Sequence, residues 1–179
     1  LAAAKKLGRP VRWTAERSES FLTDAHGRDH VTKIELGCTK DGEILAIRTE
    51  TLANVGGYLS NFSTATPTFL HGTLMAGPYK VPHVYVNVKA VFTNTAPVDA
   101  YRGAGRPEAT YFVERAMDML ARELQMDPAD VRRKNFIPKD KFPYQTQMGA
   151  VYDSGDYAKA LDTALEKSGW SDLKKQRDA

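Results

Sequence analysis

The feature that most constrains the fold is a change of hydrophobic period across one short loop. Residues Val84 to Thr93 alternate apolar and polar side chains, which predicts a β-strand. From Glu108 to Gln125 the apolar residues recur every three or four positions, which predicts an amphipathic α-helix. Pro107 suits the first helical position, where its missing N–H costs nothing. The sequence therefore predicts a strand, a loop over 94–107 and a helix in direct succession.

The loop itself contains two glycines and two arginines. Gly103 and Gly105 have no side chain, so the backbone can approach a ligand closely at these positions. The N–H groups at the start of the helix, together with Arg102 and Arg106, favour an anion or a polar oxygen. A solvated strand–helix connection would contain the same residues, because a single Gly-x-Gly is a weak signal. Chemistry alone leaves both interpretations open.

Two more strands are predicted earlier in the chain. His30 to Cys38 and Glu43 to Ala53 have alternating patterns, and Asp41-Gly42 between them is a hairpin signal. We therefore predict an antiparallel pair, and Val11 to Thr14 is also short and β-prone. The stretch from Asn61 to His71 has no clear period and predicts an ordered loop with room for a short helix.

The second half of the chain has helical patterns. Asp127-Pro128 is a cap followed by a proline, which predicts a second helix as far as about Lys134. Ser154 or Asp156 caps a final helix that Gly169 ends. Its apolar face is expected to be buried, and comprises Tyr157, Ala160, Leu161, Ala164 and Leu165.

Strands precede helices without repeated alternation, which predicts an α+β fold. Antiparallel strands of the N-terminal half would pack against C-terminal helices. The divisions are a strand-rich part (7–93), the loop (94–107) and a helical part (108–170).

Composition excludes several classes of function. The 179 residues are 42% hydrophobic and 26% charged, as in ordinary soluble globular proteins. A formal net charge of +3 is too small to indicate nucleic acid or an anionic membrane as a partner. No apolar stretch approaches the length of a membrane span. The one cysteine, Cys38, rules out an internal disulfide and a cysteine-ligated cluster, and suggests a small buried hydrophobe. The Lys174–Arg177 cluster suggests a frayed, solvated end.

Isolated titratable residues give weak signals for a site. His26 and His30 are four positions apart, but Gly27 separates them and no third ligand is evident, so we predict no metal site. His71 and His83 are expected to be loop residues.

Two carboxylates near the loop have structural interpretations. Asp99 could form an ion pair with Arg102 inside the loop. Glu108 lies in the first turn of a helix, where its charge complements the helix dipole. We assign neither residue a catalytic role.

The segment Ala100–Ala109 resembles the active-site loop of the molybdenum-binding large subunit in the xanthine dehydrogenase and aldehyde oxidase family, which includes the aerobic carbon-monoxide dehydrogenases. The resemblance extends from about Leu7 to Trp170, which is nearly the whole chain. The further matching segments, in the order of the family, are Arg9–Trp13, His26–Asp29, Asn54–Tyr58, Gly77–Pro82, Asp130–Asn135 and Tyr152–Tyr157.

This resemblance implies roles for the loop. Arg102 and Gly103 would contact the molybdenum cofactor, while Ala104, Gly105 and Leu70 would line the substrate pocket. The glutamate that serves as base in the family lies outside this chain, so no catalytic residue is expected here. The chain would be a fragment of the subunit, inactive alone.

Two departures from the family narrow the substrate. The carbon-monoxide branch has a copper-holding cysteine at the position of Gly103. The purine branch has a phenylalanine at the position of Ala104, and a substrate arginine at about the place of Leu70. The resemblance therefore implies hydroxylation of an aldehyde or N-heteroaromatic carbon, with water as the oxygen source.

The resemblance also implies cofactors and partners. The cofactor of the full-length enzyme would be molybdenum-molybdopterin, with iron–sulfur clusters and flavin on other domains or subunits. Partners would be the rest of the large subunit, the iron–sulfur and flavin subunits and a small-molecule substrate, in the cytoplasm. The alternative is a non-catalytic α+β module that binds an anion or a partner subunit through the Arg102 loop.

Overall fold

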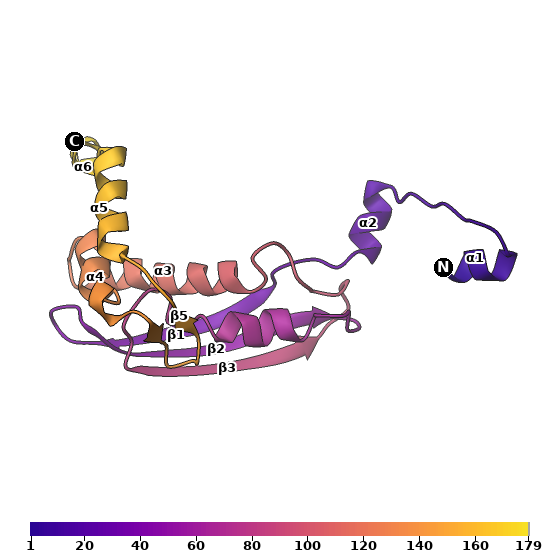
Figure 1. The fold of residues 1–179 in the computed structure, drawn as a ribbon, viewed down its shortest axis with the longest axis horizontal. Helices are drawn as coiled ribbons and strands as arrows, with labels where there is room; N and C mark the ends of the chain where they lie inside the picture. Colours follow the sequence, from indigo (N-terminus) through magenta and orange to yellow (C-terminus); the bar gives the residue numbers. More distant parts are fainter. Residues whose placement is uncertain (179) are drawn as a thin grey trace.

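A three-stranded sheet forms the centre of the molecule, and the computed structural model describes it within residues 1–178 (Figure 1). Strand β1 (His30–Cys38) pairs antiparallel with β2 (Ile44–Gly56), which confirms the predicted hairpin. Strand β3 (His83–Phe92) lies on the other side of β2, so the order is β1-β2-β3. The sheet with its helices confirms the α+β fold class.

One pairing differs from the prediction, because β3 runs parallel to β2. The register runs from Ala46 opposite His83 to Gly56 opposite Phe92. Parallel neighbours need a long crossover, and residues 57–82 provide it. This crossover contains a π-helix, η1 (Ala65–Leu70), where the sequence predicted an ordered loop with room for a short helix. Alternating side chains do not report strand direction, so the prediction of antiparallel strands is confirmed for β1 and β2 and is wrong for β3.

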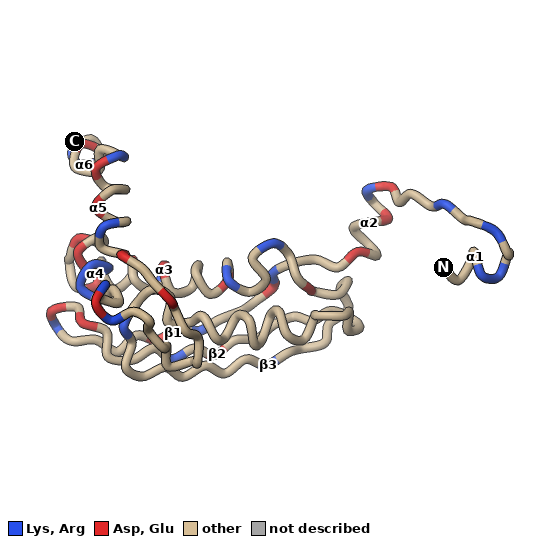
Figure 2. Tube along the Cα trace, in the orientation of Figure 1, with Lys and Arg blue, Asp and Glu red and all other residues tan. Residues whose placement is uncertain are grey.

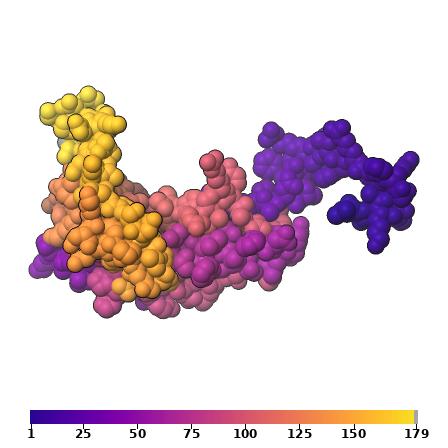
Figure 3. Space-filling view, in the orientation of Figure 1, coloured from indigo at the N-terminus to yellow at the C-terminus, as the bar shows by residue number. Residues whose placement is uncertain are grey.

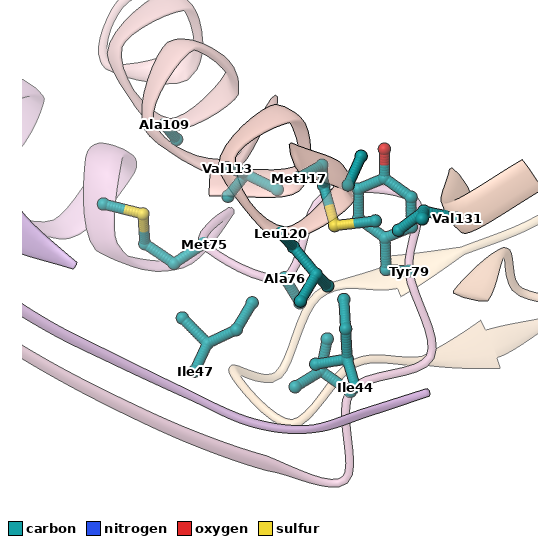
Figure 4. Close-up of a cluster of buried hydrophobic side chains, with 12 residues drawn as sticks. Ile44, Ile47, Met75, Ala76, Tyr79, Ala109, Val113, Met117, Leu120 and Val131 are labelled. Carbon is teal, nitrogen blue, oxygen red and sulfur yellow. The ribbon is translucent and has the colours of Figure 1, made fainter. Parts of the chain in front are cut away.

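The core lies between one face of the sheet and the elements that cover it (Figure 4). The buried cluster combines residues of β2, the crossover, α3 (Arg106–Glu123) and α4 (Pro128–Asn135), and comprises Ile44, Ile47, Met75, Ala76, Tyr79, Val81, Ala109, Val113, Met117, Leu120, Ala121 and Val131. Leu45 stands two positions before Ile47 and would share its face in a regular strand, yet it is 44% exposed. The register shifts between Gly37 and Cys38 opposite this point, and such a bulge turns Leu45 outward. Cys38 packs, partly buried, against this core, close to its predicted role.

The predicted helices are confirmed, and further short elements lie among them. The bounds are α3 (Arg106–Glu123), α4 (Pro128–Asn135), η2 (Lys139–Lys141), β4 (Tyr144–Gln145), β5 (Val151–Tyr152), α5 (Tyr157–Ser168) and α6 (Trp170–Asp178). Asp127 caps α4 by accepting from the Ala129 amide at 2.7 Å. Asp156, rather than Ser154, caps α5 through the Lys159 amide at 3.1 Å.

Helix α4 is fastened to the rest of the fold by its polar side chains. The buried Asn135 amide accepts from the Ile44 N–H and donates to the Gly42 carbonyl, both at 2.8 Å. Arg132 forms ion pairs with Glu114 at 2.8 Å and with Asp118 at 2.9 Å. The Lys134 ammonium donates a hydrogen bond to a backbone carbonyl of the β1–β2 turn. In Figure 2 the basic residues of α4 lie among acidic ones. The segment Asp130–Asn135 therefore joins α3, α4 and the β1–β2 turn.

The apolar face of α5 is not buried as predicted. Tyr157 is half-buried against Phe136 and Phe142, with ring centroids 5.8 and 5.7 Å away, but Ala160 and Ala164 are exposed. The helix projects from the body and lies against α4 and α6, which leave these two alanines uncovered (Figure 1). A hydrophobic period predicts that a face is covered, without saying by which segment.

The C-terminal basic cluster is helical rather than frayed. Its residues belong to α6, and the Lys174 ammonium lies 2.7 Å from the Asp127 carboxylate.

An N-terminal arm stands apart from the body (Figures 1 and 3). It contains α1 (Ala2–Leu7) and α2 (Arg17–Thr23), and Val11–Thr14 lies between them as irregular chain instead of a strand. Its large exposed apolar side chains are Leu1, Leu7, Val11, Trp13, Phe21 and Leu22. Among the described residues, no helix is both long and apolar enough to span a membrane.

Candidate functional site

The loop between β3 and α3 is held in a conformation that needs its glycines. Gly103, Ala104 and Gly105 have φ angles of 96°, 45° and 87°, so three consecutive residues are left-handed. The Ala104 N–H donates to the Tyr101 carbonyl at 2.7 Å, and the Arg106 N–H donates to the Gly103 carbonyl at 3.1 Å. Glycine adopts positive φ at little cost, so two of the three positions are unstrained. The loop is therefore a pair of tight turns that leads directly into α3.

Gly105 brings the loop against the crossover. A Cβ at Gly105 would lie 2.6 Å from the Thr66 carbonyl oxygen, 2.7 Å from the backbone nitrogen of His71 and 3.0 Å from the Leu70 carbonyl carbon. Only a residue without a side chain fits there. The structure thus brings together Leu70 and the predicted loop residues, although Gly105 itself is buried.

The exposed side of the loop carries hydrogen-bond donors. The side chains of Arg102 and Arg106 are exposed, and Figure 2 shows basic residues on the loop before α3. Within residues 1–178, the backbone amides of Arg102 and Gly103 donate to no acceptor, and the Arg102 guanidinium forms no ion pair. Cationic groups and free N–H groups together suit an anionic or oxygen-rich ligand. The donor set fits the phosphate and oxygen groups of a molybdenum cofactor.

Asp99 anchors the base of the loop, but not through Arg102 as expected. Its carboxylate accepts from the Ser60 hydroxyl, from the Ala100 amide at 2.5 Å and from the Phe62 amide at 3.3 Å. Burial opposes ionisation, yet these hydrogen bonds together hold the pKa of Asp99 below its ordinary value. The predicted Asp99–Arg102 ion pair is wrong, and Arg102 is left available at the surface.

A histidine pair lies beneath the loop. His71, expected to be a loop residue, is fully buried, and its ring centroid is 4.6 Å from that of His30. The His30 Nε2 bonds the Pro67 carbonyl at 2.9 Å, while neither ring nitrogen of His71 has a partner among the described residues. Burial, with a smaller contribution from His30, lowers the pKa of His71 to about 4. His71 is therefore neutral at pH 7.

A small cavity of about 400 Å³ opens beside the histidine pair. It is lined by Arg28, His30, Pro107, Glu108, Tyr111 and Phe112. Glu108 has a side chain only 9% exposed and lies 3.7 Å from Arg28, and its other oxygen has no described partner. Glu108 therefore forms an ion pair with Arg28 in addition to complementing the helix dipole, as expected.

Sequence analysis missed Arg28 and His71 as neighbours of the loop. The available signals were that Arg28 lies in the matching segment His26–Asp29 and that His71 directly follows Leu70, a position to which the resemblance gives a role. Among the described residues, no group of three or more His, Cys, Asp or Glu could hold a metal ion. A larger cavity of about 1150 Å³ between α3 and α6 contains none of the predicted site residues.

Comparison with known proteins places these observations in a family. Residues 1–136 match the molybdopterin cofactor-binding domain. The carbon monoxide dehydrogenase large chain of Hydrogenophaga pseudoflava is 43% identical over 171 residues, which cover 93% of this chain and 21% of that protein. The chain therefore spans about a fifth of the length of the curated relatives it matches.

Two solved structures share the fold. Quinoline 2-oxidoreductase from Pseudomonas putida 86 superposes with a TM-score of 0.91 at 29% identity, over 98% of this chain and 22% of that one. Reconstituted CO dehydrogenase from Oligotropha carboxidovorans gives a TM-score of 0.91 at 38% identity, over 99% of this chain and 22% of that one.

The close contact at Gly105 predicts a large cost for any side chain there. Gly149 provides a matched control, because its φ is 86° and a Cβ there would meet nothing within 4 Å. We expect Gly149→Ala to destabilise the fold by about 1–2 kcal/mol, the cost of a left-handed residue. Gly105→Ala should cost about 1–3 kcal/mol more, because it also overpacks the contact. Urea unfolding of the purified variants measures the free energy of unfolding of each. Equal losses of stability in the two variants would show that the backbone around Gly105 moves to accommodate the methyl group.

The buried His71 predicts a pH-dependent stability. Its folded-state pKa of about 4 lies below the ordinary 6.5, so the unfolded chain binds a proton that the folded chain does not. Stability should therefore fall by about 3 kcal/mol as the pH drops from 6.5 to 4. His71→Leu should remove this slope, whereas His83→Leu, at an exposed position, should keep it. The measurement is the free energy of unfolding at several pH values, and identical slopes in both variants would contradict the assignment.

Proposed function

The chain belongs to the molybdopterin cofactor-binding domain family, and from this premise we propose that it is part of the large subunit of a molybdenum oxidoreductase. The full-length enzyme would hydroxylate an aldehyde or N-heteroaromatic carbon, taking the oxygen from water. The observation that carries this proposal is the Arg102–Gly103 segment. Within residues 1–178 its backbone N–H groups donate no hydrogen bond and its guanidinium forms no ion pair.

The loop residues would bind and orient the cofactor. When bound, the molybdenum cofactor supplies the redox chemistry for the hydroxylation. The Arg102 and Gly103 amides would donate to its oxygen atoms, and donors fixed in advance lose little free energy on reorganisation. Ala104 and Leu70 would border the substrate, and Gly105 would hold the loop against the crossover. The general base lies in a part of the subunit outside this chain.

The small side chains at the loop support an organic substrate over carbon monoxide. Gly103 offers no thiolate, the soft ligand that Cu(I) prefers. Cys38 pairs with Ile44, and the loop follows Phe92, which pairs with Gly56 at the other end of β2. Ile44 lies 12 positions before Gly56, so at about 3.3 Å per residue Cys38 is roughly 40 Å along the sheet from the end of β3, where the loop begins. The only thiol of the chain is therefore unable to take the place of a loop cysteine.

Exposed apolar surfaces support a larger assembly. The arm carries Trp13 and Leu22, which are 69% and 79% exposed. Large apolar side chains that stand together in solvent mark a surface that another protein segment covers. Segments of the large subunit outside this chain would cover the arm and the open face of α5. Iron–sulfur and flavin groups would be carried by other domains or subunits, and we propose a cytoplasmic enzyme.

The direct test is to purify the full-length enzyme, measure molybdenum and copper, and assay dye reduction. We expect molybdenum without stoichiometric copper, turnover with aldehydes or N-heterocycles, and none with carbon monoxide. Copper at one per molybdenum with turnover on carbon monoxide would contradict the substrate class. A full-length protein that takes up no molybdenum would instead favour the non-catalytic binding module.

Two substitutions at Arg102 separate its side chain from its amide in the full-length enzyme. Arg102→Ala should lower turnover about 10- to 100-fold, through loss of a charged hydrogen bond. Arg102→Pro also removes the N–H and should cost about 100- to 1000-fold, as loss of a positioned donor does. Arg115→Ala, an exposed position on α3, serves as control. Full activity in the Pro variant would show that the loop does not contact the cofactor.

A further inference from the structure

We propose that Arg28 is a positioning residue that sets the direction of the Gly103 N–H. This inference rests on the proposed function of the loop, and it concerns a residue to which the resemblance assigns no role. Arg28 lies 74 positions before Arg102, in the segment that connects the arm to β1.

Three contacts join Arg28 to the loop and the start of α3. Its Nη2 donates to the Arg102 carbonyl oxygen at 2.6 Å. Its guanidinium carbon lies 4.8 Å from the centroid of the Tyr101 ring, within cation–π range. Its Nε lies 3.7 Å from a Glu108 oxygen. One side chain therefore contacts residues before, within and after the tight turns.

The backbone around Arg28 is seated against the same loop. The His26 N–H donates to the Pro97 carbonyl at 2.8 Å, and the Asp99 N–H donates to the His26 carbonyl at 2.7 Å. A Cβ on Gly27 would lie 2.4 Å from the Tyr101 Cβ, so this position has no room for a side chain. Arg28 itself has a φ of 67°, a left-handed value that costs an L-residue about 1–2 kcal/mol. Strain of this kind concentrates at functional positions.

The hydrogen bond from Arg28 fixes one particular peptide plane. The Arg102 carbonyl and the Gly103 N–H belong to the same trans peptide, so they point in opposite directions. A carbonyl held toward Arg28 therefore aims the Gly103 N–H toward the opposite, exposed side. Glycine at 103 would otherwise allow this peptide to rotate, because its φ is weakly restricted. The charged donor also polarises the peptide, which strengthens the Gly103 N–H as a donor.

Glu108 completes the arrangement from the first turn of α3. Its side chain is 9% exposed, and its carboxylate offsets the charge of the guanidinium where Arg28 is only 35% exposed. The pair keeps Arg28 directed at the Arg102 carbonyl rather than toward solvent. The motif His26–Asp29, which the function of the loop alone does not explain, thereby acquires a physical role.

The test uses three variants of the full-length enzyme. Arg28→Gly removes the side chain while suiting the left-handed backbone, and the relief of backbone strain offsets the cost of leaving Glu108 without its cation. Arg28→Lys keeps the charge but lacks the planar fork. The matched control is Arg115→Ala, which removes an exposed arginine from α3. Alanine is used there because glycine would weaken the helix.

Hydrogen exchange and kinetics are measured together. In Arg28→Gly, we expect amide exchange across 100–106 to increase at least about tenfold, with kcat lowered about 10- to 100-fold and KM changed less. Arg28→Lys should lie between wild type and Arg28→Gly, and Arg115→Ala should match wild type. Exchange is measured in enzyme with and without molybdenum, so the orientation of the loop is tested apart from activity.

The outcomes separate this inference from the proposed function. Exchange and kcat in Arg28→Gly equal to the control would overturn the role of Arg28. A loss of kcat that follows a matching loss of melting temperature, with Arg28→Lys equally impaired, would also overturn it and show a structural role. If Arg28→Gly does not fold, the Lys variant decides by the same criteria. A wild-type enzyme without molybdenum or turnover would refute the proposed function, and the exchange measurement would still decide whether Arg28 holds the loop.

Discussion

The parallel pairing of β2 with β3 is the constraint on which the rest of the structure depends. Because both strands end at the same edge of the sheet, Gly56 and Phe92 lie opposite each other. The chain that joins them must cross a face of the sheet, and it buries Met75 and Tyr79 there. The loop after β3 therefore emerges beside the crossover rather than beside a hairpin turn. An antiparallel β3 would have left the loop at the opposite end.

That arrangement turns an ordinary strand–helix connection into a site. The loop meets η1 at Gly105, where backbone touches backbone, and His71 fills the space beneath. From the other side, His26 and Arg28 hold the loop through backbone and guanidinium bonds. With both flanks occupied by protein, the remaining open direction is the one in which the Arg102 side chain and the free amides lie. The fold thus selects the face of the loop available to a ligand.

The sequence predicted the elements better than their spatial relations. Periodicity identified β1, β2, β3 and α3 because it reports which faces of an element are covered. It does not report direction, so the parallel pairing was missed, although the long segment 57–82 was a signal that a crossover was needed. His71 was missed because a single histidine in an aperiodic segment has no pattern to mark it as buried. Ala160 and Ala164 show the reverse error, since their period was correct but no described segment covers them.

The motifs that resemble the family divide into two kinds when their side chains are followed. Asn135 uses its buried amide on the Ile44 N–H and the Gly42 carbonyl, and Arg132 uses its guanidinium on Glu114 and Asp118. The fold itself fully explains these residues. Arg102 differs, because its exposed guanidinium forms no ion pair within residues 1–178, while the surrounding backbone is held in left-handed turns. A loop held this firmly around an unpaired guanidinium is organised to bind a group outside the chain. Because the N–H groups beside Arg102 are free to donate, that group must be a hydrogen-bond acceptor.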